Sequence, residues 1–393
     1  EAPARGFRPP HRFAVPSPRF AGGDRIAGDP RLIDGDGAGL VASMSELPPE
    51  TPAIGEVRAN NRFDVERLRA WLASRLDGFD GPVSISQFTR GASNPTFLIG
   101  AGERRYVLRK KPPGQLLASA HQVDREFRVM KALGGIGFPV PAMRLLCEDE
   151  SVIGQAFYVM DFLDGRIFRD ARMPGVAAHE RAALYDDLNA TLARLHQVDW
   201  NAIGLADYGR PGNYFERQIG RWTRQYRGAQ TEDIADMEHL ITALPARIPA
   251  DDTVTIVHGD YRPENVMFHP IEPRVIAVLD WELSTLGHPL ADLAYNCILY
   301  HSVSESWGSL VGVDFASSLI PTQTQYTEAY CRRTGRSGVE DFDFYLAFSL
   351  FRLASIGQGV FKRNLDGIGN ADPPPDNLGT HQLARTARDI LEQ

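Results

Sequence analysis

The feature that most constrains this chain is a short polar loop between two apolar segments, within residues 255–281. The first segment, Thr255–Val257, leads into the polar loop His258–Asn265. A second apolar run, Val275–Leu279, ends at the carboxylate of Asp280. Short apolar runs that are bounded by turn residues predict buried strands. We therefore expect the polar side chains of the loop to be held on a rigid base.

The loop combines the residue types that phosphoryl transfer requires. Asp260 supplies a carboxylate, Arg262 a cation and Asn265 an amide, and Asp280 adds a second carboxylate. Carboxylate and amide oxygens are hard ligands that suit Mg²⁺. In phosphoryl transfer the metal bridges the phosphates, a carboxylate positions the attacking hydroxyl, and a cation offsets the developing charge. Each residue alone is open to a second interpretation as a turn or helix cap, but the four together favour catalysis.

The segments around this loop predict an α+β chain in two parts. Residues 61–76 carry apolar side chains at helical spacing, and residues 83–160 contain short alternating runs with one helical segment at 122–133. Beyond about residue 165 the pattern is mainly helical, with a long helix at 177–195. We therefore expect a small antiparallel sheet with one inserted helix, followed by a larger and mainly helical part.

Charge and composition exclude several classes of protein. The 393 residues include 42 basic and 50 acidic side chains, a net charge of −8, which argues against a nucleic-acid-binding protein. The sequence has no run of about 18 consecutive apolar residues, so we expect no membrane contact. The three scattered cysteines predict neither a disulfide framework nor a zinc cluster, and they favour a reducing, cytoplasmic location.

The first 43 residues differ in composition from the rest. They contain six Pro, seven Gly and no Lys. Such a composition predicts a disordered extension, and five acidic residues argue against a transit peptide. We expect the folded part to begin near Met44.

The loop His258–Asn265 reads His-Gly-Asp-Tyr-Arg-Pro-Glu-Asn and resembles the catalytic loop of protein-kinase-like enzymes. Its His-Gly-Asp opening is similar to that of the aminoglycoside phosphotransferase and choline kinase branch. Leu279–Glu282 resembles the metal-binding segment of that branch, and Gly287–Ala294 extends the likeness. Tyr106–Gly114 resembles the kinase-like domains associated with acyl-CoA dehydrogenases. The resemblance implies a bilobal, protein-kinase-like fold.

This fold implies a nucleotide-binding lobe with its hinge over residues 44–163. A catalytic and acceptor-binding lobe would then occupy residues 164–393. The resemblance also implies that His258 braces the catalytic loop through hydrogen bonds. Asp292 is expected to be a structural hydrogen-bond acceptor.

Roles in the second lobe follow from the same resemblance. Asp260 is the expected catalytic base, which orients the acceptor hydroxyl. Arg262 occupies the position of the catalytic-loop lysine and is expected to face the γ-phosphate. Asn265 and Asp280 are the expected Mg²⁺ ligands, and Glu282 is a further candidate.

The first lobe is expected to bind ATP. Val107 and Arg109 share one strand face, at the spacing of the adenine-packing residue and the phosphate-binding lysine of kinases. Arg109 is therefore the first candidate, since arginine is always charged and binds phosphate bidentately. Lys110, on the opposite face, is the alternative. The other expected ATP-binding residues lie in a turn, in the next helix and at the hinge: Gly91, Ser93, Asn94, Glu126, Met160 and Leu163.

The resemblance implies an ATP- and Mg²⁺-dependent phosphotransferase that acts on a hydroxyl of a small molecule. Related domains are fused to acyl-CoA dehydrogenases, which favours a hydroxyacyl-CoA or hydroxy acid as acceptor. The alternatives are a kinase for aminoglycosides or other small molecules, and a pseudokinase that binds nucleotide without transfer. Loss of Asp260, Asn265 or Asp280 would mark a pseudokinase, and all three are present.

Overall fold

The structure analysed is a computed structural model. The residues that it describes are 54–79, 81–89, 94–112, 122–301, 308–367 and 376–393. They belong to one compact unit, Glu46–Gln393. The predicted extension 1–43 lies outside the described residues, as does Met44, and the division into two lobes at residue 163 stays a prediction.

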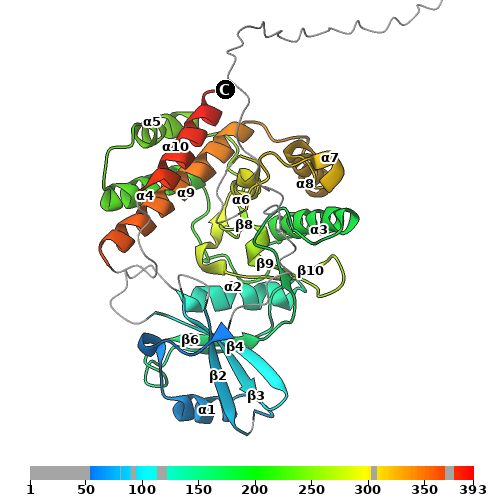
Figure 1. The fold of residues 1–393 in the computed structure, drawn as a ribbon, viewed down its shortest axis with the longest axis vertical. Coiled ribbons are helices and arrows are strands. Elements are labelled where there is room, and N and C mark those ends of the chain that lie inside the picture. Colours follow the sequence, from blue (N-terminus) through cyan, green and yellow to red (C-terminus); the bar gives the residue numbers. More distant parts are fainter. Residues whose placement is uncertain (1–53, 80, 90–93, 113–121, 302–307, 368–375) are drawn as a thin grey trace, which may run out of the picture. The chain divides into compact units, whose positions relative to one another are not determined.

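A six-stranded antiparallel sheet forms the first part of the fold (Figure 1). Its order is β1-β2-β3-β4-β6-β5. The strands are β1 Ile54–Gly55, β2 Val83–Phe88, β3 Thr96–Ala101, β4 Arg104–Lys110, β5 Met143–Cys147 and β6 Phe157–Asp161. This confirms the sheet predicted over residues 83–160.

The helix α1, Val65–Ala73, packs against this sheet through Leu68 and Leu72, which are fully buried. It is shorter than the predicted helix, because Asp64 is its N-cap and accepts a hydrogen bond from a backbone N–H of the first turn. Val65, the first residue of the helix, is 37% exposed although it is apolar.

The helix α2, Val123–Gly135, lies between the sheet and the helical part (Figure 1). Its buried apolar face includes Val123, Met130 and Leu133, so the helix predicted at 122–133 is confirmed. Glu126 is a carboxylate on this buried side of the helix.

The second part of the fold is mainly helical, as predicted. Its helices are α3 Ala178–His196, α4 Tyr214–Ala229, α5 Ala235–Ala243, α6 Pro289–Cys297, α7 Phe315–Ser318, α8 Gln323–Thr334, α9 Phe342–Leu365 and α10 Leu378–Leu391. The 3-10 turns of the described residues are η1 Ala59–Asn61, η2 Leu244–Arg247, η3 Pro263–Asn265, η4 Trp281–Leu283 and η5 Ile298–Tyr300.

The helix α9 is the central core helix, and it packs against α4, α6 and α10 (Figure 1). It is long and apolar enough to cross a membrane by length and composition. However, 72% of its apolar window is buried inside the protein, which is typical of a core helix.

Two small sheets carry the polar loop. Their strands are β7 Arg166–Ile167, β8 Thr255–Val257, β9 Val266–Phe268, β10 Val275–Val278 and β11 Thr285–Gly287. The orders are β10-β9-β7 and β11-β8, all antiparallel. The polar loop connects β8 to β9, and Asp280 follows β10, so the predicted rigid base is confirmed.

Candidate active site

The glycine of the His-Gly-Asp sequence brings the two polar segments together. Gly259 has a φ of +86°, and a Cβ at this position would lie 2.7 Å from the carbonyl oxygen of Leu283. Only glycine meets both conditions without strain. The backbone N–H of Leu279 also donates to the carbonyl oxygen of Asn265, at 2.8 Å. The loop after β8 is therefore held against the segment that contains Asp280.

The expected catalytic base lies beside two other predicted site residues. The Asn265 side-chain nitrogen donates to Asp260 Oδ2 at 2.8 Å and to the Asp260 carbonyl oxygen at 2.9 Å. Arg262 Nε lies 3.2 Å from Asp260 Oδ1. The amide nitrogen of Asn265 is thus committed to Asp260, which leaves its amide oxygen to meet a cation.

The strand cation Arg109 reaches the segment after β10. Its Nη2 lies 2.6 Å from Asp280 Oδ1 and 3.6 Å from Glu282 Oε2, while its Nε lies 3.2 Å from Glu126 Oε2. One guanidinium group therefore connects the sheet, α2 and the expected metal-binding segment.

The alternative cation, Lys110, points to the other face of β4. Its ammonium donates to Gln155 Oε1 at 2.9 Å and lies over the ring of Phe63. Lys110 is 1% exposed, and burial lowers the pKa of its ammonium group. The structure therefore brings Arg109, and not Lys110, to the other predicted site residues.

Electrostatics keep the Asp280 carboxylate ionised. Burial opposes the charge, but the positive charge and hydrogen bond of Arg109 outweigh it, so the pKa of Asp280 lies below its ordinary value. Asp280 also has left-handed backbone angles, φ 64° and ψ 61°. Such a conformation is uncommon for a residue other than glycine and is concentrated at functional sites.

Glu126, the expected residue on the helix after the strand, is the ion-pair partner of Arg109, and it has two further donors. Asn94 Nδ2 donates to Glu126 Oε1 at 2.8 Å, and the Tyr158 hydroxyl donates to Oε2 at 3.0 Å. Burial raises the pKa of Glu126, while Arg109 acts in the opposite direction. The Asn94 side-chain amide is thus directed to Glu126, and a contact of this residue with ATP stays a prediction. No sequence pattern pointed to Tyr158.

The residues expected to contact adenine lie on β4, on β6 and just after β6. Val107 is 6% exposed and pairs with Met160 in the register of β4 and β6. Met160 and Leu163 are half-buried at the connection to the second part of the fold. Gly91 and Ser93 lie outside the described residues, so their roles stay predictions.

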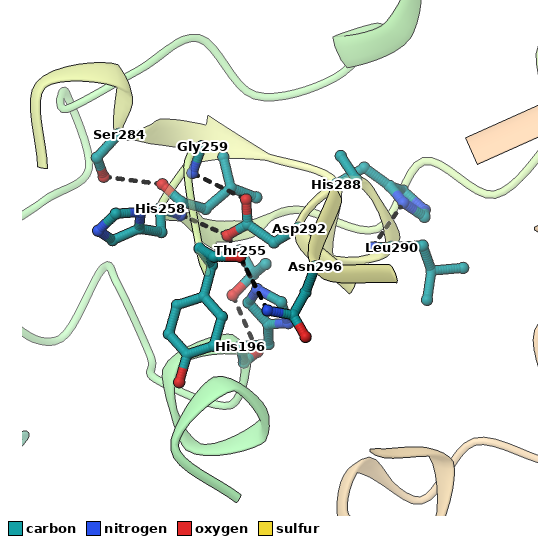
Figure 2. A network of polar contacts seen from close by, with 12 residues as sticks. His196, Thr255, His258, Gly259, Ser284, His288, Leu290, Asp292 and Asn296 are labelled. Atoms are coloured by element: carbon teal, nitrogen blue, oxygen red, sulfur yellow. Dashed lines mark hydrogen bonds and ion pairs between the residues drawn. The ribbon is translucent and has the colours of Figure 1, made fainter. Parts of the chain in front are cut away.

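Asp292 anchors the start of the catalytic loop, and Figure 2 shows its carboxylate facing the loop backbone. It accepts hydrogen bonds from the backbone N–H groups of His258 and Gly259, the second at 2.8 Å. His196 Nε2 lies 3.4 Å from the same carboxylate. Burial opposes ionisation of Asp292, but these contacts outweigh it and lower its pKa. The predicted structural role is confirmed.

His258 braces the loop from the other side. Its Nδ1 accepts the backbone N–H of Asp260 at 3.1 Å, and its Nε2 lies 2.8 Å from the carbonyl oxygen of Leu279. These contacts confirm that the ring joins the base-bearing loop to the strand before Asp280.

Arg352 is a site-supporting residue that the sequence analysis missed. It lies on α9, is 4% exposed, and donates to the carbonyl oxygen of Gly259. Its guanidinium carbon lies 5.4 Å from the ring of Trp222 and 5.2 Å from that of Tyr295. The sequence feature that could have revealed Arg352 is a single arginine within an otherwise apolar helical run.

The donor set fits a metal that arrives with nucleotide. Among the residues that the structure describes, no group of three or more His, Cys, Asp or Glu side chains could hold a metal ion. Mg²⁺ is usually bound through one or two carboxylates together with substrate phosphates. The Asp280 carboxylate and the free amide oxygen of Asn265 match that type of site.

Comparison with known sequences identifies relatives that are longer than this chain. The mouse protein "Acyl-CoA dehydrogenase family member 10" is 48% identical over 344 residues, which is 86% of this chain and 32% of the mouse protein. The human "Acyl-CoA dehydrogenase family member 11" is 44% identical over 360 residues, 86% of this chain and 46% of that protein. The chain thus spans less than half the length of these relatives.

Solved structures show the same fold. A protein from Ralstonia eutropha, provisionally named an aminoglycoside phosphotransferase, is 47% identical with a TM-score of 0.75, and the match covers 84% of this chain and 99% of that one. A ternary complex of APH(4)-Ia with AMP-PNP and hygromycin B is 17% identical with a TM-score of 0.53, covering 83% and 98%. Residues 84–329 match the sequence model of the phosphotransferase enzyme family. This chain therefore belongs to the phosphotransferase enzyme family.

Proposed function

We propose that this chain transfers the γ-phosphate of ATP to a hydroxyl group of a small molecule in an Mg²⁺-dependent reaction. The observation that carries the proposal is the convergence of Asp260, Arg262 and Asn265 with Arg109 and Asp280. Membership of the phosphotransferase family supports the reaction class. A structure of the same fold contains AMP-PNP and hygromycin B together, which supports a nucleotide and a small molecule as the two ligands of the proposed reaction.

Asp260 is the proposed base. Its Oδ2 is held by Asn265, and its Oδ1 faces Arg262, so the carboxylate has a fixed orientation toward an incoming hydroxyl. A positioned general base contributes on the order of 10²–10⁴-fold to rate. The cation of Arg262 is proposed to meet the γ-phosphate, where negative charge shifts during transfer.

Asn265 and Asp280 are proposed to hold Mg²⁺ through the Asn265 amide oxygen and the Asp280 carboxylate. When bound, the metal neutralises phosphate oxygens and orients the γ-phosphoryl group. Because the low pKa of Asp280 keeps it ionised, the ligand is ready at neutral pH without loss of a proton. Glu282 is close enough to Arg109, at 3.6 Å, to contribute charge to the same region.

ATP is proposed to bind on the side of the site that β4 and α2 form. Arg109 offers a planar guanidinium that can bind two phosphate oxygens, and Glu126 fixes its orientation from α2. Val107, Met160 and Leu163 are proposed to contact the adenine.

A hydroxyacyl-CoA or a hydroxy acid is the acceptor that we propose. The names of the longer relatives refer to acyl-CoA dehydrogenases, which supports a hydroxyacyl-CoA or a hydroxy acid.

The test is ADP release with Mg²⁺-ATP across a panel of 3- and 4-hydroxyacyl-CoAs, free hydroxy acids, choline and aminoglycosides. We expect the strongest rate with a hydroxyacyl-CoA or hydroxy acid, and no rate above background without Mg²⁺. A higher kcat/KM for an aminoglycoside would overturn the acceptor assignment. Nucleotide binding without transfer to any member of the panel would favour the pseudokinase.

A further inference from the structure

An open cavity of about 540 Å³ lies at the start of α4, outside the residues assigned above to ATP, Mg²⁺ or catalysis. Three arginines line it: Arg210, Arg217 and Arg224. Glu216 is the acidic residue of the lining. A concave surface with this balance of charge favours an anionic ligand.

Among the described residues, no carboxylate lies at ion-pair distance from Arg210, Arg217 or Arg224. One turn further along α4, Arg227 forms an ion pair with Glu238, so arginines of this helix are neutralised where a partner is available. The cavity therefore presents free positive charge.

The cavity brings like charges close together. Desolvation lowers the pKa of Arg217, and the positive charge of Arg210 lowers it further. Arg217 Nη2 donates to the carbonyl oxygen of Arg210, which fixes this side chain beside the other arginine. Asp252 is the nearby acid that offsets part of the charge, and its Oδ2 also accepts the backbone N–H of Asn213 at 3.2 Å. A bound anion would relieve the remaining repulsion.

The segment that leads into the cavity is fixed against the active-site strands. A Cβ at Gly209 would lie 2.6 Å from the backbone nitrogen of Leu286 in β11, so only glycine permits this approach. Arg125 of α2 donates to the carbonyl oxygen of Tyr208 at 2.6 Å and lies 3.4 Å from that of Ser284. Because Ser284 directly follows the η4 turn, the cavity edge is tied to the segment that begins at Asp280.

A second connection runs through α4 itself. Residues 217, 221 and 224 are spaced four and three apart, which places their side chains on one face of the helix. Desolvation lowers the pKa of Arg221, and the charge of Arg352 lowers it further. Arg221 and Arg352 also lie near one ring, that of Trp222, at 5.3 Å and 5.4 Å from its centroid. Since the buried Arg352 donates to Gly259, the helix that lines the cavity packs against the residue that supports the catalytic loop.

We propose that this cavity binds the phosphate groups of an acceptor that carries a phosphorylated tail, while its hydroxyl lies at Asp260. This inference rests on the proposed phosphotransfer and names the chemical class of the acceptor. Arginine suits such a ligand because its planar group binds phosphate oxygens bidentately. Arg217 and Arg224 are the specificity-determining residues.

The test is calorimetric binding with Mg²⁺-ADP at saturation, so that the nucleotide site is filled. The probes are coenzyme A, pantetheine, which has the same thiol arm without phosphate, and inorganic pyrophosphate. We expect coenzyme A to bind at least about tenfold more tightly than pantetheine, because each charged hydrogen bond contributes roughly 1.5–3 kcal/mol. The Arg217→Gln/Arg224→Gln variant is expected to weaken coenzyme A binding about 10²-fold and to leave ADP binding unchanged.

The matched control is Arg227→Gln, which removes an arginine from the same helix outside the cavity. It is expected to leave coenzyme A affinity unchanged, and thermal melting checks that both variants fold. Equal coenzyme A affinity in the wild type and the double variant would overturn the proposal, as would no binding to the wild type. Binding of pyrophosphate without coenzyme A would overturn the acceptor assignment in favour of a free-phosphate site. Since these readouts need no turnover, their failure is distinct from failure of phosphotransfer.

Discussion

Arg109 and Asp280 lie 171 residues apart in sequence, and their side chains meet at 2.6 Å. The contact joins the six-stranded sheet to the segment after β10. The same guanidinium reaches Glu126 on α2, so three elements converge on one cation. Lysine, which kinases have at the position expected for Arg109, could not serve two carboxylates at once as this planar fork does.

Arg109→Lys tests which strand cation serves ATP. A lysine cannot bridge Glu126 and Asp280 as a planar fork does, so we expect the KM for ATP to rise about tenfold. Lys110→Met is the matched control, because it removes the neighbouring cation on the opposite face and is expected to leave that KM unchanged. Initial rates over a range of ATP concentrations give both values. A larger effect from Lys110→Met would reverse the assignment.

Asp280→Asn tests the metal site. The loss of one carboxylate is expected to raise the Mg²⁺ concentration for half-maximal rate at least about tenfold. Glu282→Gln, two residues away, is expected to have a much smaller effect. If Glu282→Gln shifts the Mg²⁺ dependence more than Asp280→Asn, then Glu282 is the ligand.

Asp292 links the loop structure to stability and pH. A carboxylate with a lowered pKa in the folded state stabilises the protein at neutral pH, and that stabilisation is lost as the pH falls below about 4. Asp292→Asn is expected to cost roughly 3 kcal/mol at pH 7, because it leaves two backbone N–H groups facing an amide. Urea unfolding at pH 7, and at a series of pH values from about 4 down to about 2, measures both effects. An unchanged acid dependence in the variant would contradict the assigned role.

Arg352 is expected to act as a positioning residue for the catalytic loop. Arg352→Met removes the donor to the Gly259 carbonyl oxygen, and a small displacement of Asp260 lowers kcat by roughly 10²-fold. The KM for ATP is expected to stay within a few-fold, since Arg352 does not face the nucleotide side. Arg352→Lys is expected to recover part of kcat. A change confined to thermal stability would show a merely structural role.

The catalytic loop could be predicted from sequence because its information is local. The order of Asp260, Arg262 and Asn265 between two apolar runs specified both the strands and the polar loop. The helix α1 was predicted too long, since Asp64 caps its start and the helix ends at Ala73. The two-residue repeat of a strand places Arg109 and Lys110 on opposite faces, but it does not say which face lies at the site. Lys110 therefore remained an alternative to Arg109.

Contacts between distant elements could not be predicted. Arg352 supports Gly259 from a helix 93 residues later, and no local pattern connects the two. Tyr158 and Asn94 reach Glu126 across the sheet, at a separation of 32 residues each. Whether Arg217 and Arg224 form ion pairs could not be predicted either, because it depends on which carboxylates lie near them in the folded protein.

The central claim is that Asp260 acts in transfer and not in nucleotide binding. The most direct measurement compares the wild type with Asp260→Asn, by Mg²⁺-ATP calorimetry and by ADP release with the best acceptor of the panel. We predict an ATP dissociation constant within a few-fold of the wild type and a turnover lowered by about 10²–10⁴-fold. Turnover that stays at the wild-type level, with binding intact, would contradict the account.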